Sequence, residues 1–160
     1  GFNNSNQLTF NRYGAPFSTT GPTLSHSVWY HGVVTVSGTG ASEEAKVYVD
    51  GVLVSTVGSL SLNPFTYSGT TFGGSGYGGT ERYEGEMDDV AIFNSVLSAS
   101  NITAIYNGGV PNDISALSPV NWWRMGDNNS GSGTTITDQG SASNNLTLVN
   151  GPTFSTNVPS

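Results

Sequence analysis

A two-residue turn between two alternating segments is the feature that most constrains this chain. Residues 46–57 read Lys-Val-Tyr-Val, then Asp50-Gly51, then Val-Leu-Val-Ser-Thr-Val. Apolar residues at alternate positions are typical of strands with one face toward a core. Asp-Gly supplies the two positive φ angles of a type I′ turn, whose twist matches the flanking strands. The sequence therefore predicts an antiparallel hairpin, in which Asp50 is a turn residue.

Further segments with strand character lie on both sides of this hairpin. Residues 28–37 carry apolar side chains on both faces, so we expect a central strand there. A single helix is expected over 97–107, because Ser98 suits the N-cap and Gly108-Gly109 follows its end. Short strands joined by many turns predict an all-β sandwich of two antiparallel sheets with one short helix. The other expected strands are 82–93, 120–126 and 145–150, with shorter ones at 7–10 and 134–137.

Composition narrows the class of protein and its partners. The 160 residues suit one domain, and charged residues make up 9% against about 25% in ordinary soluble domains. There is no cysteine, which excludes disulfides, thiolate metal sites and cysteine nucleophiles. The net charge is −7, with Arg12, Lys46, Arg82 and Arg124 as the cations. We therefore expect no nucleic-acid partner and no membrane insertion.

Five short motifs follow one another in an order that points to a family. The resemblance is to the second half of a laminin-G-like domain of the concanavalin-A-like lectin/glucanase superfamily. It implies a jelly-roll body over residues 1–110, with opening strands abbreviated at the N-terminus, so we expect a fragment of something longer. The motifs are Trp29-Tyr30-His31, Tyr48-Val49-Asp50-Gly51, Gly85-Glu86-Met87-Asp88-Asp89-Val90, Ile92-Phe93-Asn94 and Leu97-Ser98-Ala99.

Residues 118–154 resemble the opening of such a domain, although here they come last. The termini of jelly rolls often lie side by side, so we expect residues 111–160 to complete or extend the sandwich. The strands near 120–126 and 145–150 would do so. The alternative is that this segment begins a second, truncated repeat. Residues 117–160 also resemble the ends of laminin-G-like structural proteins of marine tailed phages.

The resemblance implies a non-catalytic recognition or display module on a virion or cell surface, and therefore an extracellular location. A glycan is the expected ligand, with Tyr77, Tyr83 and Trp122 as aromatic rings that could stack on sugars. Trp122 is included because neighbouring strand residues point to opposite faces, which would leave one indole outside the core. The alternative function is structural decoration or assembly of a phage capsid or fibre. In either case we expect a homo-oligomer or a larger assembly.

A glycoside hydrolase of the same fold is the enzyme alternative. Such glucanases carry Glu-x-Asp-x-Glu on one strand, because retaining hydrolysis needs a nucleophile and a separate acid/base. Glu86 and Asp88 match the first two positions, but Val90 occupies the third. We therefore assign no catalytic residue and expect that the chain is not an enzyme.

Calcium is the cofactor that the resemblance allows. The ion takes 6–8 oxygen ligands, and family members often bind it at the rim of the sandwich. The candidate ligands are Asp88, Asp89, Asp50, Asp127 and Asp138. The alternative is that Asp88 accepts hydrogen bonds from neighbouring loop amides.

Overall fold

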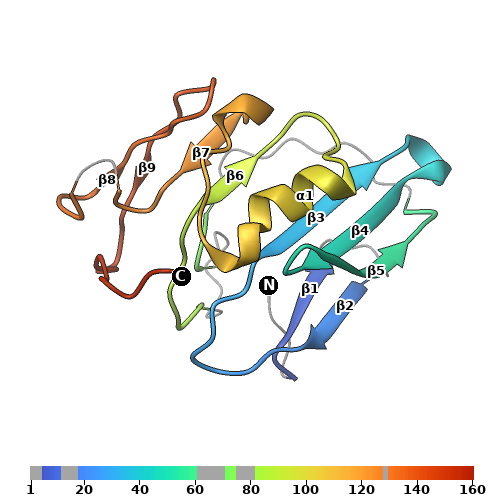
Figure 1. Cartoon of the computed structure of the whole chain (residues 1–160), viewed down its shortest axis with the longest axis horizontal. Coiled ribbons are helices and arrows are strands. Elements are labelled where there is room, and N and C mark those ends of the chain that lie inside the picture. Colours follow the sequence, from blue (N-terminus) through green and yellow to red (C-terminus); the bar gives the residue numbers. More distant parts are fainter. Residues whose placement is uncertain (1–4, 12–17, 61–70, 75–81, 128–129) are drawn as a thin grey trace.

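The computed structural model describes residues 5–11, 18–60, 71–74, 82–127 and 130–160. Every strand pair within these residues is antiparallel, and the α-helix α1 (Ala99–Tyr106) accompanies them (Figure 1). The expected all-β class with one short helix is confirmed. The strands are β1 (Gln7–Asn11), β2 (Ser18–Thr23), β3 (Gly32–Ser37), β4 (Glu44–Val49), β5 (Val52–Val57), β6 (Val90–Ile92), β7 (Asn121–Trp123), β8 (Thr135–Ile136) and β9 (Leu146–Thr147).

The three-stranded sheet β3-β4-β5 holds much of the core. Ala45, Val47 and Val49 alternate along β4 and are at most 6% exposed. The β1–β2 pair lies against the same sheet, since a Cβ added to Gly21 would be 3.6 Å from side-chain atoms of Val49 and Val54. The alternation in the sequence therefore corresponds to burial in the structure.

The predicted hairpin is confirmed. Asp50 and Gly51 join β4 to β5 with φ angles of 50° and 76°, both positive as a type I′ turn requires. The turn is also tied to the segment before β3. Asp50 donates its backbone N–H to the His31 carbonyl, and its carboxylate accepts the His31 N–H, each at 2.8 Å. Asp50 therefore forms the turn and also links it by hydrogen bonds to His31, directly before β3.

Helix α1 begins and ends as the sequence predicts. The Ser98 hydroxyl accepts the Asn101 N–H at 3.1 Å, and Asn107 takes the left-handed conformation that ends the helix. Ile102 is fully buried, and α1 packs on the β4–β5 turn, where the Thr103 hydroxyl donates to the Gly51 carbonyl at 3.4 Å. Within the described residues, no helix has the length and apolar character that a membrane crossing requires.

Two strand predictions need correction. Residues 28–37 were expected to form a central strand, but only Gly32–Ser37 is extended, and among the described residues β3 pairs with β4 alone. Of the strand predicted over 82–93, the structure has only β6, Val90–Ile92. Asp89 has a φ of 43°, a left-handed conformation that breaks the extended backbone just before β6.

The C-terminal segment lies beside the body through a β6–β7 pair. Val90 faces Trp123 and Ile92 faces Asn121 in the register, and the Val120 N–H adds a bond of 2.8 Å to the Ile92 carbonyl. Strands β8 and β9 form a second small pair next to β7 (Figure 1). A bridge between Trp123 and Asp138 joins the two pairs. Strand β7 is thus held to β6 by backbone pairing, and the β8–β9 pair is joined to β7.

Candidate functional site

An open hollow of about 1430 Å³ lies between β3 and the segment that leads into β6. One wall is formed by residues 24–36, and the facing wall by residues 82–97. The end of α1 and residues 157–160 complete the rim. Both walls carry aromatic side chains, whereas the carboxylates lie on the 82–97 wall and at Asp50 of the β4–β5 turn. The hollow therefore combines flat apolar surfaces with hydrogen-bond acceptors. The aromatic and acidic side chains are Trp29, Tyr30, Tyr83, Phe93, Tyr106, Asp50, Glu84, Glu86, Asp88 and Asp89.

Tyr83 presents a fixed ring at the hollow. Its side chain is 38% exposed, and its hydroxyl donates to the Glu86 carbonyl at 3.1 Å. The ring lies against Gly85, where an added Cβ would be 2.7 Å from the ring carbon that bears the hydroxyl. Glycine is the residue that permits this close approach. An exposed ring held at its hydroxyl end can stack on a flat ligand without a large loss of side-chain entropy.

The carboxylates beside Tyr83 differ in their surroundings. Glu86 is exposed, and hydrogen bonds from Ser155 and Asn157 lower its pKa. Burial, followed by repulsion from Asp89, raises the pKa of Asp88 to about 6. Burial also raises the pKa of Asp89, although a hydrogen bond from Trp122 opposes the shift. Ionisation of Asp88 and Asp89 therefore costs free energy, first because they are partly buried and then because like charges lie close by.

Asp89 is the start of a small polar network between β6 and β7. Its carboxylate accepts the Trp122 indole N–H at 2.8 Å and lies 3.7 Å from the Arg124 side chain. The Arg124 guanidinium lies 5.4 Å from the centre of the Trp122 ring and forms a 2.6 Å ion pair with Asp127. This network occupies Asp89, Arg124 and Asp127 with one another.

Trp122 is buried, contrary to the expectation that one indole lies outside the core. Trp122 is 6% exposed and Trp123 is 3% exposed. Both faces of β7 are covered, because Arg124 lies over Trp122 while Phe72 packs edge-on against Trp123, with ring centres 5.5 Å apart. Trp122 therefore has no free ring face to offer a sugar, and the stacking role predicted for it is wrong.

Asp138 organises the C-terminal turns. One carboxylate oxygen accepts the backbone N–H groups of Trp122 and Gly140 at 2.7 and 2.8 Å. The other accepts the Asn121 side chain at 2.6 Å and the Asn144 N–H at 2.8 Å. Burial alone would raise the pKa of Asp138, but these bonds outweigh it and lower the pKa. Asp138 thus serves the fold rather than the hollow.

His31 has a structural environment as well. Its ring stacks against Tyr106 with centres 6.0 Å apart, and its backbone holds the Asp50 turn. Burial lowers its pKa, against the influence of Asp50. The imidazole is therefore neutral at pH 7 and forms part of the wall.

The predicted site residues separate into three groups. Tyr83, Asp50, Asp88 and Asp89 line the hollow, whereas Trp122, Asp127 and Asp138 do not. Tyr77 lies outside the described residues. The sequence prediction missed the side chains of the facing wall, Trp29 and Tyr30. Their signal was present, because two aromatic residues stand together at the start of the Trp-Tyr-His motif.

The predicted calcium ligands are not gathered in one place. Asp50 and Asp138 bind backbone amides in different parts of the fold, and Arg124 supplies the cation near Asp89 and Asp127. In the described part of the chain, no three His, Asp or Glu side chains lie close enough together to hold a metal ion. Calcium stays a prediction that this arrangement does not favour.

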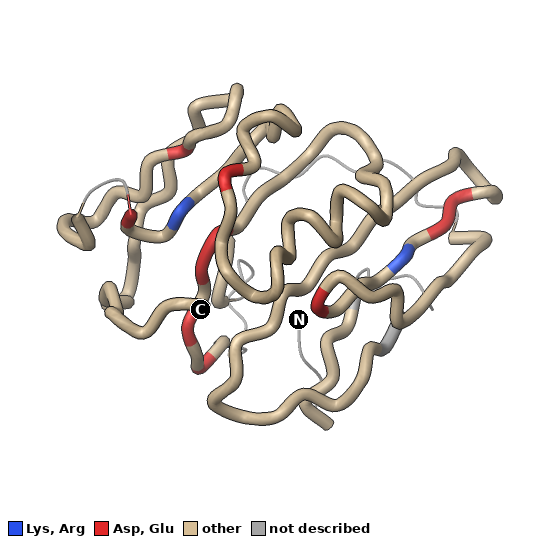
Figure 2. Tube along the Cα trace, in the orientation of Figure 1, with Lys and Arg blue, Asp and Glu red and all other residues tan. Residues whose placement is uncertain are grey.

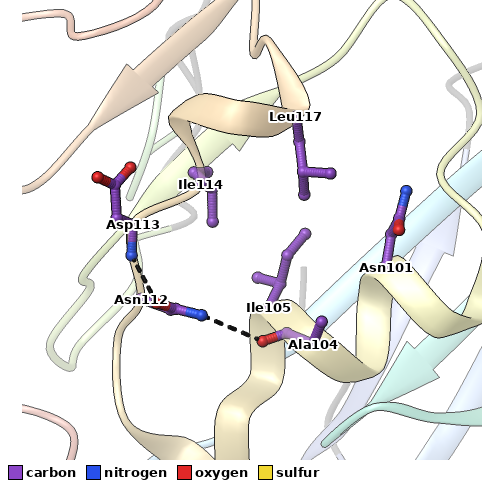
Figure 3. A pocket seen from close by; sticks show the side chains of 7 residues that line it. All are labelled: Asn101, Ala104, Ile105, Asn112, Asp113, Ile114 and Leu117. Atoms are coloured by element: carbon purple, nitrogen blue, oxygen red, sulfur yellow. Dashed lines mark hydrogen bonds between the residues drawn. The ribbon is translucent and has the colours of Figure 1, made fainter.

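A second, much smaller pocket lies between α1 and the 3₁₀ helix η3 (Ser115–Leu117). Its volume is about 140 Å³, and in Figure 3 Ile105, Ile114 and Leu117 point into it. The Asn112 side chain donates to the Ala104 carbonyl at 3.5 Å at its edge. A pocket of this size admits a single small apolar group, as cavities of about 150 Å³ do elsewhere. It is too small for an oligosaccharide.

Comparison with known proteins places the fold. A laminin-G-type family model, described as the concanavalin A-like lectin/glucanases superfamily, matches residues 1–103. The chain belongs to this superfamily. The match includes strands β1 to β6, the hairpin turn and the two walls at residues 24–36 and 82–97, so the expected family is confirmed.

Other comparisons add little. No curated protein matches the chain. Among solved structures, an S-layer domain-containing protein from Clostridium thermocellum matches with 24% identity and a TM-score of 0.39. The match covers 62% of this chain and 50% of that one, so this superfamily member spans about half of that structure.

Proposed function

We propose that this domain is a non-catalytic glycan-binding module that acts on an extracellular surface. The observation that carries the proposal is the fixed, exposed ring of Tyr83 at the edge of an open hollow whose walls hold carboxylates. Sugars offer an apolar ring face and many hydroxyl donors, which match an aromatic platform and carboxylate acceptors. The hollow, at about 1430 Å³, is large enough for several sugar rings.

The electrostatics of the segment also favour binding over hydrolysis. A general acid needs a raised pKa, but hydrogen bonds from Ser155 and Asn157 lower the pKa of Glu86. Val90 stands where the third acid of a glucanase would be, and it pairs with Trp123 in the β6–β7 ladder. A glycosidase needs an acid and a second carboxylate across the scissile bond. The lowered pKa of Glu86 therefore does not suit the acid, and Val90 supplies no carboxylate at the third position.

One observation favours a hydrolase as the second candidate. The pKa of Asp88 is raised to about 6, which suits a proton donor near neutral pH. A reducing-sugar assay on the same glycans that bind distinguishes the two functions. Release of sugar that the Asp88→Asn variant loses would establish the enzyme and overturn the binding proposal.

Binding itself is tested on a glycan array, followed by calorimetry of each positive oligosaccharide. The proposal predicts reversible binding that Tyr83→Ala weakens about tenfold, the loss expected for one stacked ring. Tyr48→Phe is the matched control, because Tyr48 is 6% exposed on β4 and does not line the hollow. Absence of binding to every glycan, with correctly folded protein, would support the alternative of a decoration or assembly protein that contacts other chains.

A further inference from the structure

The charges on the walls of the hollow are predominantly negative. Among the described lining residues, the acidic side chains outnumber the arginine, Arg82. Figure 2 shows the acidic residues as a run of red along the stretch before β6, with another red position at the β4–β5 turn across from it. The acidic lining residues are Asp50, Glu84, Glu86, Asp88 and Asp89.

Most of these carboxylates have no cation beside them. Of the ion pairs in the described residues, the one that reaches this set joins Arg124 to Asp89, and Arg124 also pairs with Asp127. The bond from Asn157 to Glu86 comes from a neutral amide. The His31 ring on the opposite wall is neutral at pH 7, because burial lowers its pKa. The hollow therefore keeps a negative potential.

We propose that the hollow selects glycans that carry free amino groups over neutral glycans, and rejects sulfated and uronic-acid glycans. This inference rests on the proposed glycan-binding function and names its substrate class. An ammonium group on a sugar ring can donate charge-assisted hydrogen bonds to Glu84 or Asp88 while the ring lies on Tyr83. A sulfate or carboxylate in the same position would meet like charges without a compensating donor.

The test compares three soluble oligosaccharides of equal length by calorimetry. They are a glucosamine hexamer with free amines, its fully N-acetylated counterpart, and a sulfated uronic-acid hexamer. The buffer contains EDTA, and its pH lies above the Asp88 pKa of about 6 and below the pKa of the sugar amines, so that both groups are charged. We expect the free-amine hexamer to bind roughly tenfold more tightly than the acetylated one, and the preference to shrink in 0.5 M salt. No binding is expected for the sulfated hexamer.

The double variant Glu84→Gln/Asp88→Asn isolates the charge effect. It should reduce the preference for amines over the acetylated hexamer to about threefold or less. Glu44→Gln is the matched control, because Glu44 pairs with Lys46 on β4 and does not line the hollow. It should leave the preference unchanged.

The possible failures are distinguishable. Equal binding of the amine and acetylated hexamers, or stronger binding of the sulfated one, overturns the charge inference and leaves the glycan-binding proposal intact. A preference that the double variant retains also overturns it. No binding of any of the three, nor of any array glycan, overturns the proposed function and the inference with it.

Discussion

The indole N–H of Trp122 donates a 2.8 Å hydrogen bond to the carboxylate of Asp89. Asp89 stands directly before β6 and Trp122 lies on β7, so the bond joins the body of the domain to its C-terminal segment. The Arg124 guanidinium lies over the same indole and near the same carboxylate. The segment that leads into β6 and lines the hollow is therefore held in place by its contacts with β7.

Removing this donor should destabilise the domain. Trp122→Phe keeps most of the buried ring but leaves the half-buried Asp89 carboxylate without its N–H partner. We expect a loss of about 1–3 kcal/mol in the free energy of unfolding, measured by urea denaturation. Asp89→Asn should cost less, because an amide oxygen still accepts the indole N–H. A Trp122→Phe variant as stable as the parent would show that the bond does not contribute.

Asp138 should contribute strongly to the stability of the domain, although it lies in a loop. Asp138→Asn leaves one acceptor oxygen where four donors converge, and we expect a loss of about 3 kcal/mol. The folded pKa of Asp138 is lowered, so its contribution is present above the unfolded pKa and disappears as pH falls through the folded pKa. The parent and variant should therefore converge in stability at low pH. Asp127→Asn, which breaks an exposed ion pair, is the control and should change stability by less than about 1 kcal/mol.

Asp88 should give the opposite pH dependence. Its folded pKa of about 6 lies above the ordinary value of 3.8, so ionisation costs the folded state stability. That cost grows as pH rises from the ordinary value through 6 and is constant above it. Asp88→Asn should therefore gain roughly 1 kcal/mol relative to the parent between pH 4 and pH 8, after discounting for partial exposure.

Chemical denaturation at both pH values measures this difference. Asp113→Asn is the control, because hydrogen bonds from Ser115 lower the pKa of Asp113 below its ordinary value of 3.8. Its relative stability should therefore not change between the two pH values. A relative stability of Asp88→Asn that does not change with pH would contradict the raised pKa assigned to Asp88, which burial and then repulsion from Asp89 cause.

The hairpin turn gives a prediction at a single glycine. Gly51 has a φ of 76°, and an added Cβ would lie 3.3 Å from the Tyr106 ring and 3.4 Å from the Thr103 Cα. Gly51→Ala should cost about 1–2 kcal/mol from backbone strain and crowding against α1. Gly58→Ala is the control, since a Cβ there meets nothing within 4 Å. Equal melting temperatures for the two variants would argue against the packing of α1 on this turn.

Local chemistry made part of the fold predictable. Asp50-Gly51 dictates its own turn, and Ser98 caps α1 through a bond to a residue three positions away. Such features depend on neighbours in the sequence, so alternation and capping rules capture them.

The parts that sequence reasoning missed depend on distant contacts. The rule that one side of a strand faces water placed one indole outside, but Arg124 and Phe72 cover both faces of β7. The alternating pattern of 82–93 predicts an extended strand throughout, and nothing in it indicates the left-handed backbone at Asp89. The sequence identifies Tyr83 as an aromatic residue in a loop. The residues that face it across the hollow depend on how β3 packs opposite, which the sequence does not reveal.

Amide chemical-shift mapping by NMR, during titration with an oligosaccharide that scores on the array, tests the central claim most directly. The account predicts that the perturbed amides lie on residues 24–36 and 82–97, centred on Tyr83. Perturbations that gather instead at the small pocket between α1 and η3, or on β8 and β9, would contradict the assignment of the hollow as the glycan site.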